Sequence, residues 1–238
     1  MRSIVTPRGF AFVFEIPRSS ILAVSALLFD FDGVLADTEN IHVAAWERTL
    51  ARFGLVLDDD ACAPAAEVDD REFFAELLRA RGIEHGDVEG WTARKQALAV
   101  ELLRGSPRLF PGVAELIATL RPRPELKIGI VSTTRRSNIE AVLAASGLVD
   151  AFDVVIARED VARPKPDPAG YLLALERLGV EARDAAALED SAVGLDAARA
   201  AGLRVIAVGH RRPAGHWSGD APYVKNLRTP DEIFAHLQ

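Results

Sequence analysis

Residues 26–33 read Ala-Leu-Leu-Phe-Asp-Phe-Asp-Gly, an apolar run that stops at a pair of acids. A short apolar run followed by polar residues and a glycine is typical of a buried strand that ends in a turn. We predict the first strand at residues 26–30, and further apolar runs predict strands at residues 127–131, 153–156, 185–188 and 205–208. Helical patterns lie between them at residues 112–120, 137–145, 168–178 and 192–201. This alternation predicts an α/β fold built on a doubly wound parallel sheet.

A long stretch without a convincing strand, residues 39–107, separates the first two strands. It is too long for a loop, and it places apolar residues at helical spacing in residues 42–53, 71–80 and 92–103. We therefore expect a small inserted α-helical cap domain at 39–107, an α/β core domain formed by 21–38 and 108–238, and an N-terminal extension at 1–20. Residues 10–14 of the extension fit either an edge strand or a disordered segment.

The composition favours a soluble protein that binds small molecules. Its 35 acidic and 28 basic residues give a formal charge of −7, which repels nucleic acid and anionic membranes, so we expect neither as a partner. The longest apolar stretch, residues 21–29, is far shorter than the ~20 residues of a membrane helix. Cys62 is the only cysteine, which excludes an internal disulfide and fits a reducing compartment. We expect a cytoplasmic monomer or homodimer.

Polar residues gather where the predicted strands end. Ligands of open α/β sheets bind outside the carboxyl ends of the strands, so residues that follow different strands share one crevice. The residues at these positions are Asp30, Asp32, Gly33, Ser132, Thr133, Lys165, Glu189 and Asp190.

Four of these residues are carboxylates. Asp30 and Asp32 are two apart on an extended chain and should face the same way, and Gly33 permits the turn that follows. Adding Glu189 and Asp190 crowds four like charges, which raise the cost of ionising one another unless a cation is present. Hard oxygen ligands favour Mg²⁺. The sequence therefore predicts a magnesium site formed by Asp30, Asp32, Glu189 and Asp190, although the last two would also suit a helix cap.

The remaining residues suit a phosphate group. Ser132, Thr133 and Lys165 supply donors of the kind that hold phosphate. Asp30 would then attack phosphorus and form an aspartyl-phosphate. Asp32 would protonate the leaving oxygen and later deprotonate a water molecule. The sequence predicts a magnesium-dependent phosphatase with a small phosphorylated substrate.

The ordered set resembles the haloacid dehalogenase-like superfamily, whose phosphatases carry Asp-x-Asp-Gly, a Ser or Thr, a Lys and a final acidic pair. The insert after the first motif resembles the subgroup with a helical cap that includes β-phosphoglucomutase and phosphoglycolate phosphatase. Residues 132–138 and 171–179 are most similar to CbbY-type sugar-bisphosphate phosphatases. The resemblance implies a sugar phosphate or bisphosphate as substrate, with xylulose-1,5-bisphosphate as one candidate.

The resemblance also implies substrate-binding roles for Thr38, His42 and Arg71. A histidine placed like His42 helps position the general acid in the mutase, and a cap arginine placed roughly like Arg71 meets the distal phosphate. The CbbY-type cap pattern contains Gly-Gly-Lys-Glu-Arg, whereas residues 68–72 read Val-Asp-Asp-Arg-Glu. His42 could equally be an ordinary helix residue. Arg71 and Lys95 are also interpretable as solvated cap charges, and the basic residues 210–212 as solvated surface.

Two other functions use the same residues. A β-phosphoglucomutase-like mutase would keep the aspartyl-phosphate until the same sugar returns. A non-catalytic module that binds a phosphorylated metabolite is the third possibility, because a fold alone does not fix function.

Overall fold

The computed structural model describes residues 23–52, 54–56, 70–83, 87–106, 108–216 and 221–238. The predicted N-terminal extension lies outside the described residues, as does Cys62. None of the described helices is long and apolar enough to cross a membrane.

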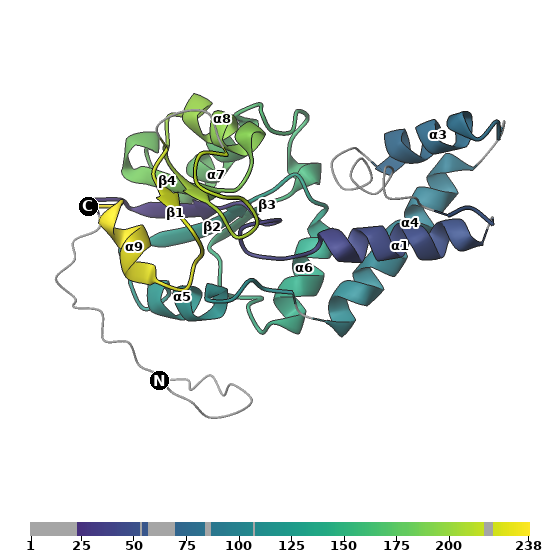
Figure 1. Cartoon of the computed structure of the whole chain (residues 1–238). Helices are drawn as coiled ribbons and strands as arrows, with labels where there is room; N and C mark the ends of the chain where they lie inside the picture. Colours follow the sequence, from purple (N-terminus) through teal and green to yellow (C-terminus); the bar gives the residue numbers. More distant parts are fainter. Residues whose placement is uncertain (1–22, 53, 57–69, 84–86, 107, 217–220) are drawn as a thin grey trace.

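A parallel sheet forms the centre of the core domain (Figure 1). Its strands run in the order β3-β2-β1-β4-β5-β6, and every described pairing between neighbours is parallel. This arrangement confirms the predicted fold class. The strands are β1 (Ala26–Phe29), β2 (Lys127–Val131), β3 (Val154–Ile156), β4 (Ala185–Glu189), β5 (Arg204–Val208) and β6 (Tyr223–Val224).

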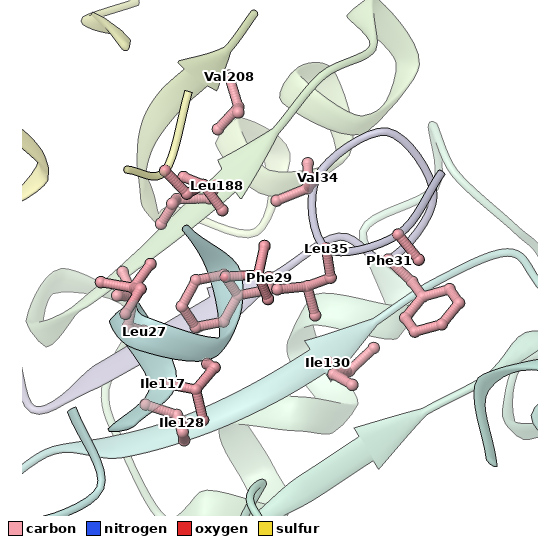
Figure 2. Close-up of a cluster of buried hydrophobic side chains, with 14 of the residues drawn as sticks. Leu27, Phe29, Phe31, Val34, Leu35, Ile117, Ile128, Ile130, Leu188 and Val208 are labelled. Atoms are coloured by element: carbon pink, nitrogen blue, oxygen red, sulfur yellow. The ribbon is translucent and has the colours of Figure 1, made fainter. Parts of the chain in front are cut away.

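Helices cover both faces of the sheet (Figure 1). One face carries α7 (Ala169–Leu178) and α8 (Ala192–Ala200), and the other carries α5 (Val113–Leu120), α6 (Arg136–Ala145) and α9 (Pro230–Ala235). Successive side chains of β1 alternate between the two layers, as the pleat of a strand requires. Leu27 and Phe29 pack with Ile117 of α5 (Figure 2), whereas Leu28 packs with the α7 and α8 layer.

The C-terminal elements β6 and α9 were absent from the sequence prediction. A strand of two residues is too short to display an alternating pattern, so its formation depends on pairing with β5. The α9 helix begins with proline and contributes the buried Ile233 and Phe234 to the core.

The described part of the stretch predicted as a helical insert contains the cap helices α1 (Glu39–Ala51), α3 (Asp70–Ala80) and α4 (Val88–Gly105). They share a small apolar core in which the rings of Trp46 and Phe74 stack with centroids 5.5 Å apart. The α4 helix begins four residues before the predicted start at residue 92, because the Asp87 side chain accepts a hydrogen bond from the backbone N–H of Gly90 (2.8 Å).

The two connections between core and cap lie side by side. Ala36 and Leu109 form an antiparallel bridge, and the N–H of Asp37 donates to the carbonyl of Arg108 (2.7 Å). Arg211, from the loop after β5, forms ion pairs with Asp37 and with Glu39 at the start of α1. The C-terminal half of the sheet is thereby tied to the hinge of the cap.

We expect Leu116→Ala in α5 to lower the free energy of unfolding by about 2–5 kcal/mol, because Leu116 is fully buried and its truncation leaves a cavity. Urea unfolding monitored by circular dichroism measures this loss. Leu172→Ala is the matched control, since Leu172 is 49% exposed and should change stability by about 0.5 kcal/mol or less. Equal losses in the two variants would contradict the packing described.

Candidate active site

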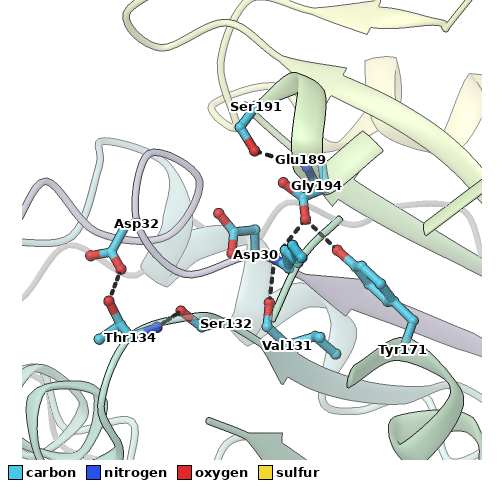
Figure 3. A network of polar contacts seen from close by, with 10 residues as sticks. Asp30, Asp32, Val131, Ser132, Thr134, Tyr171, Glu189, Ser191 and Gly194 are labelled. Atoms are coloured by element: carbon cyan, nitrogen blue, oxygen red, sulfur yellow. Dashed lines mark hydrogen bonds and ion pairs between the residues drawn. The ribbon is translucent and has the colours of Figure 1, made fainter. Parts of the chain in front are cut away.

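Asp30 directly follows β1 and is almost buried, with 7% of its surface exposed. Its backbone N–H donates to the carbonyl of Leu188 in β4 (3.0 Å). Lys165, from the loop between β3 and α7, places Nζ 2.6 Å from Asp30 Oδ1 and 2.6 Å from Glu189 Oε1. The same nitrogen donates to the carbonyl of Val131 at 2.8 Å. One ammonium therefore joins the ends of β1, β2 and β4 through Asp30, Val131 and Glu189, the three partners labelled in Figure 3.

Lys165 remains charged in this buried position. Burial by itself would lower the pKa of the ammonium, but the carboxylates of Asp30 and Glu189 raise it above its ordinary value. Burial raises the pKa of Asp30, and Lys165 partly offsets that effect. Lys165 thus supplies the positive charge that an ionised Asp30 requires away from water.

Tyr171 is a member of the site that the sequence analysis did not assign. Its hydroxyl donates to Glu189 Oε1 (2.5 Å), and the side chain is fully buried on α7. A buried tyrosine at helical spacing looks like an ordinary core residue in the sequence, so no signal pointed to this contact. Its effect is to fix one oxygen of Glu189 and to leave the other available.

Three predicted metal ligands come together. Asp30, Glu189 and Asp190 each offer a carboxylate oxygen, and these atoms lie within 4.8 Å of one another. Burial, followed by the charge of Asp30, raises the pKa of Glu189 to about 7 and that of Asp190 to about 8. Among the described residues, the buried Oε2 of Glu189 has no hydrogen-bond partner. These oxygens fit a hard divalent cation, whose charge would stabilise all three carboxylates.

Two glycines leave room for the acids. A Cβ at Gly194 would overlap the carboxylate of Glu189, and a Cβ at Gly33 would overlap that of Asp190. Gly33 also has a φ of 82°, which glycine adopts without strain. A glycine at position 33 therefore also allows the Asp190 carboxylate to lie close to the backbone of the turn.

The fourth predicted ligand, Asp32, does not bring its carboxylate into this group. The prediction assumed an extended chain through Asp32, but β1 ends at Phe29 and the chain turns at Gly33. The carboxylate of Asp32 instead accepts hydrogen bonds from the hydroxyls of Thr38 and Thr134. Burial raises the pKa of Asp32, and the two hydroxyls partly offset this rise.

Thr38 connects Asp32 to the cap, since it precedes α1 directly. Thr134 was not assigned in the sequence analysis, although it neighbours the predicted Ser132 and Thr133. Its N–H donates to the hydroxyl oxygen of Ser132 (3.0 Å), while the side chain of Thr133 is exposed. Ser132 is 5% exposed and directly follows β2 at the carboxyl edge of the sheet.

A cavity of about 600 Å³, called the catalytic cavity below, lies between core and cap. A volume of this size suits a small organic ligand. Its lining includes Asp32, Gly33, Thr38, His42, Thr133, Lys165 and Asp190 among the predicted site residues, together with Lys95 and Gln96 of α4.

The interpretation of Lys95 as a solvated charge is wrong. Its side chain is 2% exposed, its Nζ lies 2.5 Å from Asp70 Oδ1, and it lies over the Trp46 ring. His42 Nδ1 accepts from the same nitrogen at 3.3 Å. Burial, followed by the charge of Lys95, lowers the pKa of His42 to about 4, so its imidazole is neutral at pH 7. The long apolar stem of Lys95 made this burial possible, and the sequence pattern could not show it.

Arg71 lies apart from the other predicted residues. Its guanidinium pairs with Glu89 (2.6 Å), and it borders a second hollow of about 640 Å³ between α4 and the start of α6. Gln96 and Arg135 border both cavities. The role of Arg71 at a distal phosphate stays a prediction.

The basic residues 210–212 are more than solvated surface. Arg211 and Arg212 both line the catalytic cavity, and the His210 ring stacks on Phe110 at the hinge with centroids 4.0 Å apart. They follow β5 at the carboxyl edge of the sheet, the same positional signal that identified the other site residues.

Comparison with known proteins agrees with this geometry. The family model for haloacid dehalogenase-like hydrolases matches residues 24–202. Protein CbbY of Rhodobacter capsulatus is 35% identical over 226 residues, covering 91% of this chain and 97% of the relative. β-Phosphoglucomutase of Bacillus subtilis is 29% identical, with 80% and 85% of the two chains covered.

A solved structure of a CbbY variant from Rhodobacter sphaeroides in complex with xylulose-(1,5)bisphosphate superimposes with a TM-score of 0.72 at 32% identity. The match covers 86% of this chain and 95% of the other. Together with the six-stranded parallel sheet and the ordered acidic and basic residues at its carboxyl edge, these matches show that the chain belongs to the haloacid dehalogenase-like hydrolase family.

Proposed function

We propose that this protein is a magnesium-dependent phosphatase that hydrolyses a small sugar phosphate or sugar bisphosphate through an aspartyl-phosphate on Asp30. The observation that carries the proposal is the buried Asp30 carboxylate, held by Lys165 beside the carboxylates of Glu189 and Asp190. Lys165 and Asp190 line the catalytic cavity. The phosphatases and sugar-phosphate enzymes among its relatives support the substrate class.

In the first half-reaction, a free oxygen of Asp30 attacks phosphorus while the bond from phosphorus to the ester oxygen breaks. Asp32 gives a proton to the departing sugar oxygen. In the second half-reaction, Asp32 takes a proton from water, the water oxygen bonds to phosphorus, and the bond to Asp30 breaks. Inorganic phosphate and an unmodified Asp30 result.

The remaining residues bind and orient. Lys165 would donate hydrogen bonds and neutralise charge as the phosphoryl group approaches Asp30, and the hydroxyls of Ser132 and Thr133 would donate to the phosphoryl oxygens. Asp30, Glu189 and Asp190 would hold Mg²⁺, which when bound supplies Lewis-acid stabilisation of the phosphoryl charge. Thr38 and Thr134 orient the carboxylate of Asp32.

Xylulose-1,5-bisphosphate is the first substrate to test, because the CbbY variant complex contains it. A mutase is the second candidate, favoured by the similarity to β-phosphoglucomutase. Conversion of β-glucose 1-phosphate without release of inorganic phosphate would favour the mutase, whereas stoichiometric phosphate release favours the hydrolase.

Asp30→Asn is expected to lower phosphate release by at least about 10³-fold, because the amide keeps the shape of the side chain and removes the nucleophile. A colorimetric phosphate assay with Mg²⁺ and a sugar-phosphate panel measures the loss. Asp231→Asn, at an exposed position on α9, is the control and should retain wild-type turnover. Wild-type turnover by the Asp30 variant would refute the proposed nucleophile.

Asp32→Asn should slow turnover by about 10²- to 10⁴-fold, the usual contribution of a general acid–base. Water attack loses its base, so a good leaving group should still allow the phosphoenzyme to accumulate. Rapid quenching followed by intact-mass measurement would detect one added phosphoryl group on the protein. Finding the group on a peptide that lacks Asp30 would contradict the mechanism.

Gly194→Ala should raise the Mg²⁺ concentration for half-maximal activity by about 10- to 100-fold, because the added Cβ displaces Glu189 without removing any carboxylate. The control is Gly105→Ala, where an added Cβ meets nothing within 4 Å. Excess chelator should abolish wild-type activity, and added Mg²⁺ should restore it. Activity that persists in excess chelator would exclude the metal role.

A further inference from the structure

Six cationic side chains line the described part of the catalytic cavity, and four of them face carboxylates. Lys165 contacts Asp30 and Glu189, and Lys95 contacts Asp70. Arg211 pairs with Asp37 and Glu39, and Arg212 interacts electrostatically with Asp190. The charge of these four is therefore largely balanced within the protein.

The other two cations, Arg135 and Arg158, differ in their surroundings. Arg158 Nη1 donates to the carbonyl of Val161 (3.1 Å), a neutral acceptor. Within the described ranges, neither guanidinium has an ion pair with a carboxylate. Positive charge without a countercharge attracts an anion to that part of the cavity.

Acids adjacent to Arg158 are engaged elsewhere. Asp160 accepts from Arg136 (2.5 Å) and from Arg177 (3.4 Å). Glu159 accepts from the backbone N–H of Arg136 (3.0 Å). These contacts hold the carboxylates away from the guanidinium of Arg158 and leave its charge for a ligand.

The two arginines stand on adjoining loops. Arg135 follows β2 and precedes α6, and Arg158 begins the turn η1 (Arg158–Asp160) after β3. The N–H of Arg158 donates to the carbonyl of Thr134 (3.0 Å), which joins the loops at the carboxyl edge of the sheet. Both side chains line the catalytic cavity that also contains Thr133 and Lys165.

The described cap residues offer a substrate less unbalanced positive charge than Arg135 and Arg158 of the core do. Its buried Lys95 is paired with Asp70, and Arg71 is paired with Glu89 beside the second hollow. A ligand that enters the catalytic cavity therefore meets its uncompensated cations on the core side.

We propose that Arg135 and Arg158 bind a second phosphate group of the substrate, remote from the phosphoryl group that is transferred. The inference rests on the proposed phosphatase function and makes core loops, not the cap arginine, the determinant of preference for a bisphosphate. Planar guanidinium groups suit phosphate because each can donate two parallel hydrogen bonds. The transferred phosphate occupies the site beside Asp30, and the sugar spans the distance between the two.

The test compares matched substrates with and without the second phosphate: xylulose 1,5-bisphosphate against xylulose 1-phosphate, and fructose 1,6-bisphosphate against fructose 1-phosphate. We expect wild-type protein with Mg²⁺ to prefer the bisphosphate in kcat/KM by at least about 10-fold in at least one pair. Arg158→Gln and Arg135→Gln should each reduce that preference by about 10- to 100-fold, mainly through a higher KM for the bisphosphate, because each removes a charge-assisted hydrogen bond.

Controls separate recognition from folding. The preference is a ratio measured on one protein sample, so a partly unfolded variant does not imitate the effect. Arg158→Lys should retain part of the preference. Arg183→Gln is the matched control, since Arg183 is 81% exposed and lies outside both cavities, and it should keep the wild-type ratio.

The outcomes are distinguishable. Hydrolysis of the monophosphates without any preference for bisphosphates would overturn the inference and leave the phosphatase function standing. A preference that is lost in Arg71→Gln but retained in both core variants would also overturn it, in favour of the cap. Absence of phosphate release from every substrate would refute the proposed function and the inference together.

Discussion

The site depends on the ammonium of Lys165, which joins carboxylates from two different strands. Asp30 and Glu189 stand at the ends of β1 and β4, and two anionic side chains this close would repel each other in a buried setting. Lys165 comes from the loop after β3 and offsets that repulsion. Its hydrogen bond to the Val131 carbonyl holds the ammonium at the end of β2. The neighbouring strands β1 and β4 can therefore both end in acids.

The same arrangement leaves the negative charge of the three carboxylates only partly balanced. Tyr171 and Lys165 both donate to Glu189 Oε1, and the buried Oε2 has no donor among the described residues. Lys165 balances one charge of the three carboxylates. A divalent cation matches the remainder, which is why we connect this cluster with Mg²⁺ and not with a second ammonium group.

Contacts at the hinge relate the position of the cap to the geometry of the acid. Thr38 directly precedes α1 and donates to Asp32, so one hydrogen bond of this carboxylate comes from the connection to the cap. Arg211 pairs with Asp37 and Glu39 on the same connection. A further contact joins cap and core, since Gln96 of α4 donates a hydrogen bond to Asn138 of α6 (2.5 Å). The position of the cap and the orientation of the Asp32 carboxylate are thus connected through these contacts.

Local sequence alone determined the fold class and the order of the motifs. Apolar runs, helical spacing and polar residues at strand ends are properties of neighbouring residues, and parallel strands necessarily bring their carboxyl ends to one edge. These properties predict Asp30, Lys165, Glu189 and Asp190 in one crevice, and the structure brings these four residues together.

Tertiary structure decided which way each side chain turns and which charges are balanced. The turn at Gly33 directs the Asp32 carboxylate to Thr38 and Thr134 instead of to the group formed by Asp30, Glu189 and Asp190. Packing buries Lys95 over the ring of Trp46. Tyr171 reaches Glu189 only because α7 lies against the sheet. Contacts of this kind join residues distant in the chain, so they depend on how helices and loops pack, which the periodicity of a single sequence does not encode.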